Sequence, residues 1–114
     1  MSAVLAALDA GAVPERIVLR EAVRALLTEL RRVAPGRSVE VRIPPYGAIQ
    51  CVEGPTHTRG TPPNVVECDA TTFVLLATGR LGWSAAVAAG RVNASGIRAD
   101  LSPYLPLIET VTDS

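Results

Sequence analysis

An amphipathic segment at residues 14–36 most strongly limits what this chain can fold into. Its apolar side chains step by four and three residues, which is the spacing of one face of an α-helix. They are Leu19, Val23, Leu26, Leu30 and Val33. Pro14 suits the first turn of such a helix, and Pro35-Gly36 ends it. Because a helix with one apolar face must bury it, we expect this helix to lie against a sheet.

After residue 37 the pattern changes from the helical period to strict alternation. Val39, Val41 and Ile43 alternate with polar residues, which predicts a strand with one buried face. Further strands are expected over residues 46–53, 64–69 and 91–95. In two of these strands the cysteines, Cys51 and Cys68, fall on the apolar face. Both sulfur atoms are therefore expected in apolar surroundings.

Two short helices are expected over residues 69–79 and 83–90. Asp69 is a good N-cap for the first, worth about 1 kcal/mol against alanine, and Gly79 is a good C-terminal stop. Ser84 is the expected cap of the second helix, and Gly90 its stop. Helices and strands in this order predict an α+β fold.

The chain of 114 residues has the length of one domain, and it shows neither internal repeats nor a linker. We therefore expect a single domain over residues 1–114. Residues 1–12 and 109–114 are expected to be loosely ordered, with at most a short helical turn at residues 3–8. Pro106 should stop any helix that begins near residue 100.

The charges exclude several classes of function. Eleven basic residues balance eleven acidic ones without a block of either sign, so a nucleic-acid partner is not expected. All eleven basic residues are arginine, which excludes a Schiff-base lysine and a phosphate-loop lysine. No apolar run approaches the roughly 20 residues of a membrane span, and the N-terminus has no basic region typical of a signal peptide. These features predict a cytoplasmic protein with reduced cysteines.

One proline-rich stretch, from Cys51 to Cys68, combines both cysteines with the only histidine, His57. Glu53 or Glu67 could orient the imidazole, but their spacing defines no catalytic arrangement. Structural zinc uses four ligands and commonly a close cysteine pair, whereas these cysteines are seventeen positions apart. We therefore predict no catalytic residue, no metal and no cofactor here. The stretch is expected to be an ordered surface loop between two antiparallel strands, with His57 and Arg59 at the surface.

Residues 69–96 carry a set of motifs at fixed spacing. They are Asp69 at a helix start, Thr78-Gly79-Arg80-Leu81, Gly90-Arg91-Val92 and Ser95-Gly96. This region resembles the C-terminal half of the sterol carrier protein domain, and the preceding helix and strands follow that family's order. The whole chain looks most like the short bacterial, especially actinobacterial, sterol-carrier-like proteins.

The resemblance implies a mixed, mainly antiparallel sheet covered by an N-terminal helix and short C-terminal helices. It also implies an apolar cavity that binds a fatty acid, a sterol or another apolar ligand, without enzymatic activity. The residues then expected to line the cavity are Ile49, Phe73, Leu76, Leu81, Trp83, Val87, Leu105 and Ile108. For each of them, ordinary packing in the core is the alternative.

The sequence departs from the family pattern in the second short helix. Members usually place bulky residues there, whereas residues 85–89 are alanine except for Val87. Small side chains either widen a cavity or let the helix close onto the sheet. A second interpretation is therefore a ligand-free accessory or protein-interaction module, similar to domains fused to thiol-dependent isomerases, with a protein partner or a homodimer. A third is a small enzyme that uses His57.

Overall fold

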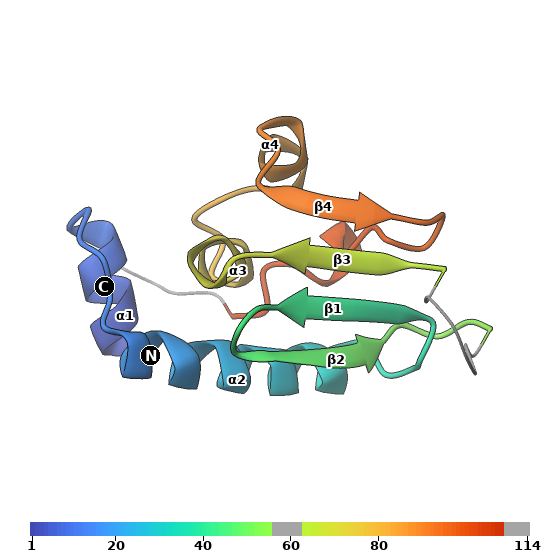
Figure 1. The fold of residues 1–114 in the computed structure, drawn as a ribbon, viewed down its shortest axis with the longest axis horizontal. Coiled ribbons are helices and arrows are strands. Elements are labelled where there is room, and N and C mark those ends of the chain that lie inside the picture. The colour runs from blue at the N-terminus through green and yellow to red at the C-terminus, as the bar shows by residue number, and fades with distance from the viewer. Residues whose placement is uncertain (56–62, 109–114) are drawn as a thin grey trace.

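The computed structural model describes residues 1–55 and 63–108. Two helices, three strands, two further helices and a fourth strand follow one another along the chain and form an α+β fold, which confirms the predicted class (Figure 1). The elements are α1 (Ser2–Asp9), α2 (Arg16–Val33), β1 (Val39–Ile43), β2 (Gly47–Cys51), β3 (Val65–Cys68), α3 (Ala70–Ala77), α4 (Trp83–Ala88), β4 (Val92–Ser95) and a 3-10 helix, η1 (Ser102–Tyr104).

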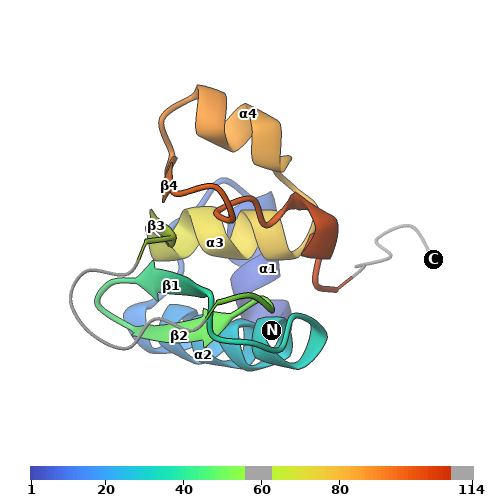
Figure 2. The same cartoon turned by 90° about the vertical axis from the view of Figure 1, so that its right-hand side faces the viewer.

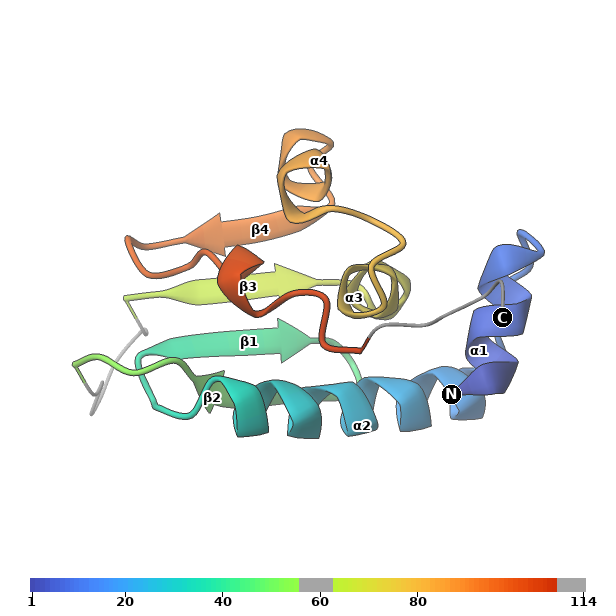
Figure 3. The same cartoon turned by 180° about the vertical axis from the view of Figure 1, so that it is seen from behind.

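The four strands form one mixed sheet in the order β2-β1-β3-β4. β1 is antiparallel to β2 and parallel to β3, and β3 is antiparallel to β4. Seen from behind, α2, α3 and η1 lie in front of the strands (Figure 3). Among the described elements, no helix covers the opposite face (Figure 1). α4 stands at the end of the molecule opposite α2 (Figure 2).

The core lies between β1 and the two helices α2 and α3. The alternation in β1 is confirmed, since Val39, Val41 and Ile43 are at most 1% exposed. The apolar face of α2 packs against them, and its residues Leu26 and Leu30 are at most 2% exposed. Alternating burial in the strand and helical spacing in α2 therefore place both apolar faces against each other, as the sequence predicts.

The ends of α2 differ in two details from the prediction. The helix begins at Arg16 with Glu15 as its N-cap, so Pro14 lies just outside the first turn. Val33, predicted to continue the apolar stripe, is 36% exposed. It is the last helical residue, and the buried C-cap residue Ala34, 2% exposed, takes the inward position instead.

The caps of α3 are as predicted, whereas the cap of α4 is not. A side-chain oxygen of Asp69 accepts a hydrogen bond of 2.9 Å from the backbone N–H of Thr72. Gly79 follows α3 with a φ of 77°, a left-handed value that glycine adopts without strain. In α4, Gly82 is the N-cap and the expected cap, Ser84, lies inside the helix. The reason is that Gly82 is extended and Trp83 is already helical.

The N-terminal residues form a longer helix than the short turn expected. α1 buries Val4 completely against the core. At its end, Asp9 receives two hydrogen bonds from Arg80, from Nε at 2.7 Å and from Nη2 at 2.9 Å. This guanidinium lowers the pKa of the Asp9 carboxyl below its ordinary value. The pair connects α1 to the turn that follows α3.

His57 and Arg59 lie within residues 56–62, which are outside the described residues. The prediction of an ordered surface loop with both side chains at the surface concerns these residues and stays a prediction. The strands on either side of these residues are not neighbours, because β1 lies between β2 and β3. Within residues 1–55 and 63–108, no helix has the length and apolar character that crossing a bilayer requires.

Candidate functional site

A pocket of about 210 Å³ lies between the end of α3, the start of α4 and the segment around η1. We call it the α3–η1 pocket. It is lined by Leu76, Gly79, Leu81, Gly82, Trp83, Ser102, Leu105 and Pro106. All of these residues come from helices and turns and none from a strand. The pocket therefore lies beside the sheet and not directly on it.

A tight turn after α3 forms one wall of the pocket. The backbone N–H groups of Arg80 and Leu81 both donate to the carbonyl oxygen of Leu75, at 2.9 and 3.1 Å. A side chain at Gly79 would begin 3.5 Å from the ring of Pro106, so the turn packs closely on the opposite wall. The reversal brings Leu81 and the first residue of α4 to the pocket.

The C-terminal segment forms the opposite wall. After η1, the N–H groups of Leu107 and Ile108 both donate to the carbonyl oxygen of Ala77, at 2.8 and 3.1 Å. That carbonyl belongs to the last residue of α3, whose final carbonyls have no partner inside the helix. These bonds hold Leu105 and Pro106 over the end of α3.

The chemistry of the lining is apolar. None of the eight lining residues has an ionisable side chain, and the polar groups are the Ser102 hydroxyl and the Trp83 indole N–H. Leu76 is 3% exposed, while Leu81, Trp83 and Leu105 are partly buried, so apolar surface remains accessible at this site. Such a lining holds an apolar group by burial, with one or two donors to orient it.

The structure brings together four of the eight residues predicted to line a cavity. These four are Leu76, Leu81, Trp83 and Leu105. Ile108 lies just beyond the pocket and packs, partly buried, against the core. Phe73 is 3% exposed and belongs to the core.

The other two predicted residues lie elsewhere. Ile49 is on β2, at the edge of the sheet far from β4, and Val87 is 41% exposed on α4. Four further lining residues were not predicted from the sequence: Gly79, Gly82, Ser102 and Pro106. Glycine and proline mark turns where a wall can form, so Gly79, Gly82 and Pro106 carried a signal, whereas Ser102 did not.

Both cysteines are buried and free, as the strand pattern predicts. Burial raises the pKa of the Cys51 thiol to about 11. Burial, aided by the neighbouring Asp69, raises the pKa of Cys68 to about 12. A disulfide does not fit the register. Cys51 pairs with the first residue of β1, and Cys68 lies beside the last, roughly 13 Å further along the strand.

No metal site is formed by the described part of the chain, where no three His, Cys, Asp or Glu side chains converge. The histidine is outside these residues, so the third interpretation, an enzyme that uses His57, is not tested by them. The described residues form further pockets at α1–α2, β2 and β4, each with at least one ionisable side chain in its lining, and the α3–η1 pocket is the candidate site because its lining has none.

The family model described as bacterial SCP ortholog matches residues 15–107. The chain belongs to this sterol-carrier-protein-like family. The match runs from the start of α2 to the C-terminal wall of the pocket, and it confirms the resemblance first seen in residues 69–96. A comparison with curated proteins found no match.

Two of the motifs that carry the resemblance, those containing Gly79 and Gly90, have a common structural role in this member of the sterol-carrier-protein-like family. Gly79 and Gly90 each follow a short helix with a left-handed φ, 77° and 73°. A residue with a Cβ is strained in that conformation, so both helices need glycine where the chain turns away. The first of these turns forms a wall of the α3–η1 pocket.

Proposed function

We propose that this protein binds the apolar part of a lipid or of another apolar small molecule in the α3–η1 pocket, without covalent chemistry. The observation that carries the proposal is the lining, in which Leu76, Leu81, Trp83 and Leu105 converge without an ionisable side chain. Membership of a sterol-carrier-protein-like family supports the same ligand class.

The volume of the pocket limits how much of a ligand it holds. Sites for drug-sized molecules measure roughly 300–1,000 Å³, whereas an engineered cavity of about 150 Å³ binds benzene. At about 210 Å³, the pocket accommodates one ring or a short length of acyl chain. The remainder of a longer ligand would extend through the open side. We therefore expect medium-chain fatty acids to bind at least as well as sterols.

Fluorescence of Trp83 provides a direct test, because it is the only tryptophan in the chain and lines the pocket. Titration with decanoic acid should shift the emission of Trp83 to shorter wavelength and saturate. The binding should show a negative heat-capacity change in calorimetry, which is the mark of apolar burial.

Gly82 offers a variant that adds a side chain at the lining of the pocket. Its backbone is extended with a φ of −79°, and an added Cβ meets no atom within 4 Å. Gly82→Leu should therefore fold, with a modest loss of stability because glycine is the better N-cap of α4, and should weaken decanoic acid binding by at least about tenfold. Gly82→Ala is the matched control, and its affinity should stay within about threefold of the original. Equal binding by the leucine variant would place the ligand elsewhere.

A second candidate function is a ligand-free accessory or interaction module. It is favoured by the small pocket volume and by apolar side chains that remain at the surface, such as Ile97, which is 98% exposed. Titration decides between the two functions. If neither decanoic acid nor a sterol changes Trp83 emission or releases heat, the carrier function is wrong and the second candidate stands.

A further inference from the structure

A groove runs beside the free edge of β2, on the side of the molecule remote from the α3–η1 pocket. Its volume is about 470 Å³. We call it the β2 groove. It is lined by Arg31, Pro35, Gly36, Arg37, Ala48, Ile49 and Gln50. The lining combines the end of α2 and the following turn with the outer strand of the sheet.

The backbone of β2 has unused hydrogen-bonding groups along this groove. The N–H of Glu40 donates to the carbonyl oxygen of Asn64, so the backbone of Glu40 faces β3 and its neighbour Val41 faces β2. The backbone N–H and C=O groups of Ile49, which pairs with Val41, therefore point toward β1. The N–H and C=O groups of Ala48 and Gln50 then point outward. Within the described chain, β2 pairs with β1 alone.

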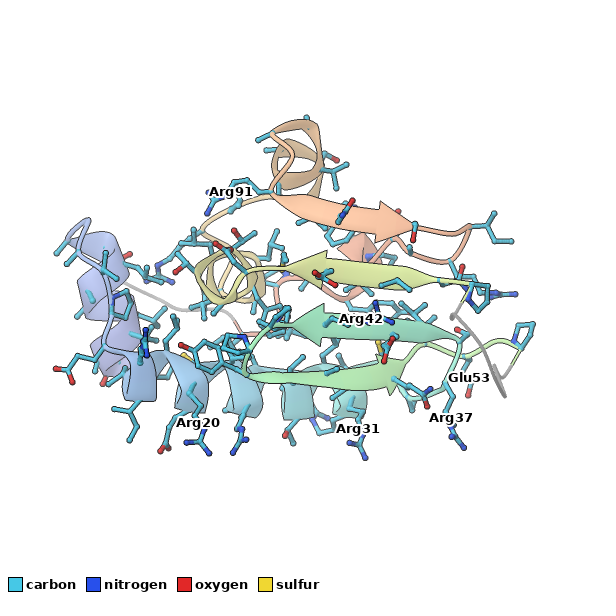
Figure 4. The ribbon with its side chains drawn as sticks, viewed as in Figure 1. Arg20, Arg31, Arg37, Arg42, Glu53 and Arg91 are labelled. Carbon is cyan, nitrogen blue, oxygen red and sulfur yellow. The ribbon has the colours of Figure 1, made fainter. Side chains whose placement is uncertain are left out.

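The charge of the groove is positive. Arg31 and Arg37 line it, and no acidic residue is among its lining. Nε of Arg37 donates to Oε1 of Gln50 at 3.0 Å, which keeps its charge, and Arg31 makes no ion pair with residues 1–55 or 63–108. Figure 4 shows Arg20, Arg31 and Arg37 extending from the same side of the molecule.

Two nearby carboxylates are engaged by other arginines, whereas Glu53, beside the turn at Gly36, forms no ion pair within residues 1–55 and 63–108. Glu29, on α2, pairs with Arg32 at 2.6 Å. Glu40, on β1, pairs with Arg42 at 2.6 Å. The two arginines of the groove outnumber the one carboxylate of Glu53, so a net positive charge remains, which favours an acidic partner.

One end of the groove is held by a strained residue. Val52 has a φ of 67°, which is rare for a β-branched residue. Its N–H donates to the carbonyl oxygen of Ala34 at 2.7 Å, and its own carbonyl oxygen accepts from the N–H and hydroxyl of Ser38. A side chain at Gly36 would collide with the same carbonyl. These contacts fix the turn that carries Arg37 before any partner arrives, which lowers the entropy cost of binding.

We propose that the β2 groove binds an extended acidic segment of another protein, which adds to β2 as a fifth strand. A bare sheet edge is a template for this kind of pairing. β2 has five residues and spans roughly 17 Å, so it can pair with a segment of similar length. Main-chain hydrogen bonds to Ala48 and Gln50 supply the register, and Arg31 and Arg37 select acidic side chains.

A second copy of this chain is the less suitable occupant. Two β2 strands paired about a two-fold axis would bring the same surface of both copies together. Arg31 and Arg37 of one copy would then face those of the other, with no carboxylate lining the groove to compensate. Like charges across a strand pair are destabilising.

The test uses a fluorescein-labelled peptide of three Val-Glu repeats and, as its charge control, three Val-Lys repeats. Anisotropy should show saturable binding of the first peptide only. Ala48→Pro removes an outward N–H at an edge position that tolerates proline, and it should weaken binding by at least about tenfold. Ala94→Pro is the matched control on the opposite edge strand β4 and should leave the affinity within about twofold.

The charge is tested separately. Arg31→Glu combined with Arg37→Glu should weaken the Val-Glu peptide by at least about tenfold, while Arg91→Glu, an exposed arginine beside β4, should have little effect. Binding of decanoic acid should be unchanged in all of these variants, because none of them lines the α3–η1 pocket.

Amide exchange of the original protein keeps the proposal testable if Ala48→Pro does not fold. The Val-Glu peptide should slow exchange at Ala48 and Gln50 and leave Ala94 unchanged. Three results would overturn the proposal. They are full binding by a folded Ala48→Pro variant, no added protection on β2, and a concentration-dependent dimer that Ala48→Pro dissociates.

Discussion

The two ends of the sheet are covered by helices that pack very differently. At the β2 side, α2 buries six residues, Leu19, Ala22, Val23, Leu26, Leu27 and Leu30. At the β4 side, α4 buries only Ala86, and Val87 is 41% exposed. The first end is a filled core. The second consists of small side chains, partly buried aromatics and a pocket.

This difference indicates how the chain divides stability from the binding of apolar ligands. Apolar surface that is already packed contributes to folding but offers nothing to a ligand. Surface that is only partly covered contributes less to stability and stays available. The alanines at residues 85–89 therefore do not close α4 onto the sheet to form a second core. They leave the α3–η1 pocket beside a lightly packed helix.

Substitution in the two helices should give the largest contrast. Leu30 is fully buried in α2. Leu30→Ala should lower the unfolding free energy of the protein by roughly 3–5 kcal/mol, because the neighbouring residues cannot refill the cavity that it leaves. Val87→Ala, in α4, should change it by less than about 0.5 kcal/mol, as at an ordinary surface site. Urea denaturation measures both. Comparable losses at the two positions would show that α4 packs as tightly as α2.

The buried thiols should produce the next-largest effect, a loss of stability at alkaline pH. In the unfolded chain a thiol ionises near pH 8.5, about two units or more below the pKa of about 11 and 12 in the fold. Stability from these thiols is complete below about pH 8.5 and is lost as pH rises toward the folded values. At pH 9.5 we expect a loss of roughly 2–3 kcal/mol relative to pH 7.

A double variant, Cys51→Ala with Cys68→Ala, is the control for this pH effect. This variant should be less stable than the original protein at pH 7. Its unfolding free energy should fall less between pH 7 and pH 9.5, because it lacks the two thiols with raised pKa values. Both thiols of the original protein should also react slowly with a thiol reagent until the fold is denatured. Fast labelling of either thiol in the native state would contradict their burial at the β2 and β3 ends of the core.

Local patterns in the sequence predicted the filled end of the molecule well. The stripe of α2 and the alternation of β1 each describe one face of one element, and the fold needs only to place the two faces together. The Asp69 cap was also readable, because its partner is three residues away. The burial of Val33 and the capping role of Ser84 were predicted wrongly, because the ends of a helix depend on the neighbouring turn. Ala34 takes the buried position at the end of α2, and Gly82 is the N-cap of α4.

The lining of the pocket was harder to predict because it depends on how turns and strands are arranged in three dimensions. Nothing local indicates that β1 inserts between β2 and β3, yet this order puts Ile49 three strands away from β4. Val87 and Trp83 are in the same short helix, and only the packing of α4 places one in the pocket and leaves the other at the surface. The residues of the pocket are brought together by turns whose direction the sequence does not specify.

Trp83 gives a third, smaller prediction at the lightly packed end. If the ring were a buried core aromatic, the alternative that the sequence leaves open, its loss would cost roughly 3–5 kcal/mol. In the structure it is only partly buried and lines the pocket. We therefore expect Trp83→Ala to lower the unfolding free energy by roughly 1–2 kcal/mol. It should also weaken decanoic acid binding, which calorimetry can measure without the fluorophore. A loss as large as that of Leu30→Ala would remove the contrast between the two ends.

The ion pair between Asp9 and Arg80 joins the two regions, and breaking it should have the smallest effect. The Asp9 side chain is 51% exposed, so water and salt screen the pair, and such pairs contribute little to stability. Asp9→Asn should lower the midpoint of thermal unfolding less than Trp83→Ala does. Because the pKa of Asp9 is lowered, the contribution of the pair is present above its ordinary range and lost as pH falls through the lowered value. The difference between Asp9→Asn and the original protein should therefore shrink in acid and in high salt. If the difference instead stayed constant with pH, the pair would not be the cause, and α1 would be held to the pocket end by its apolar contacts alone.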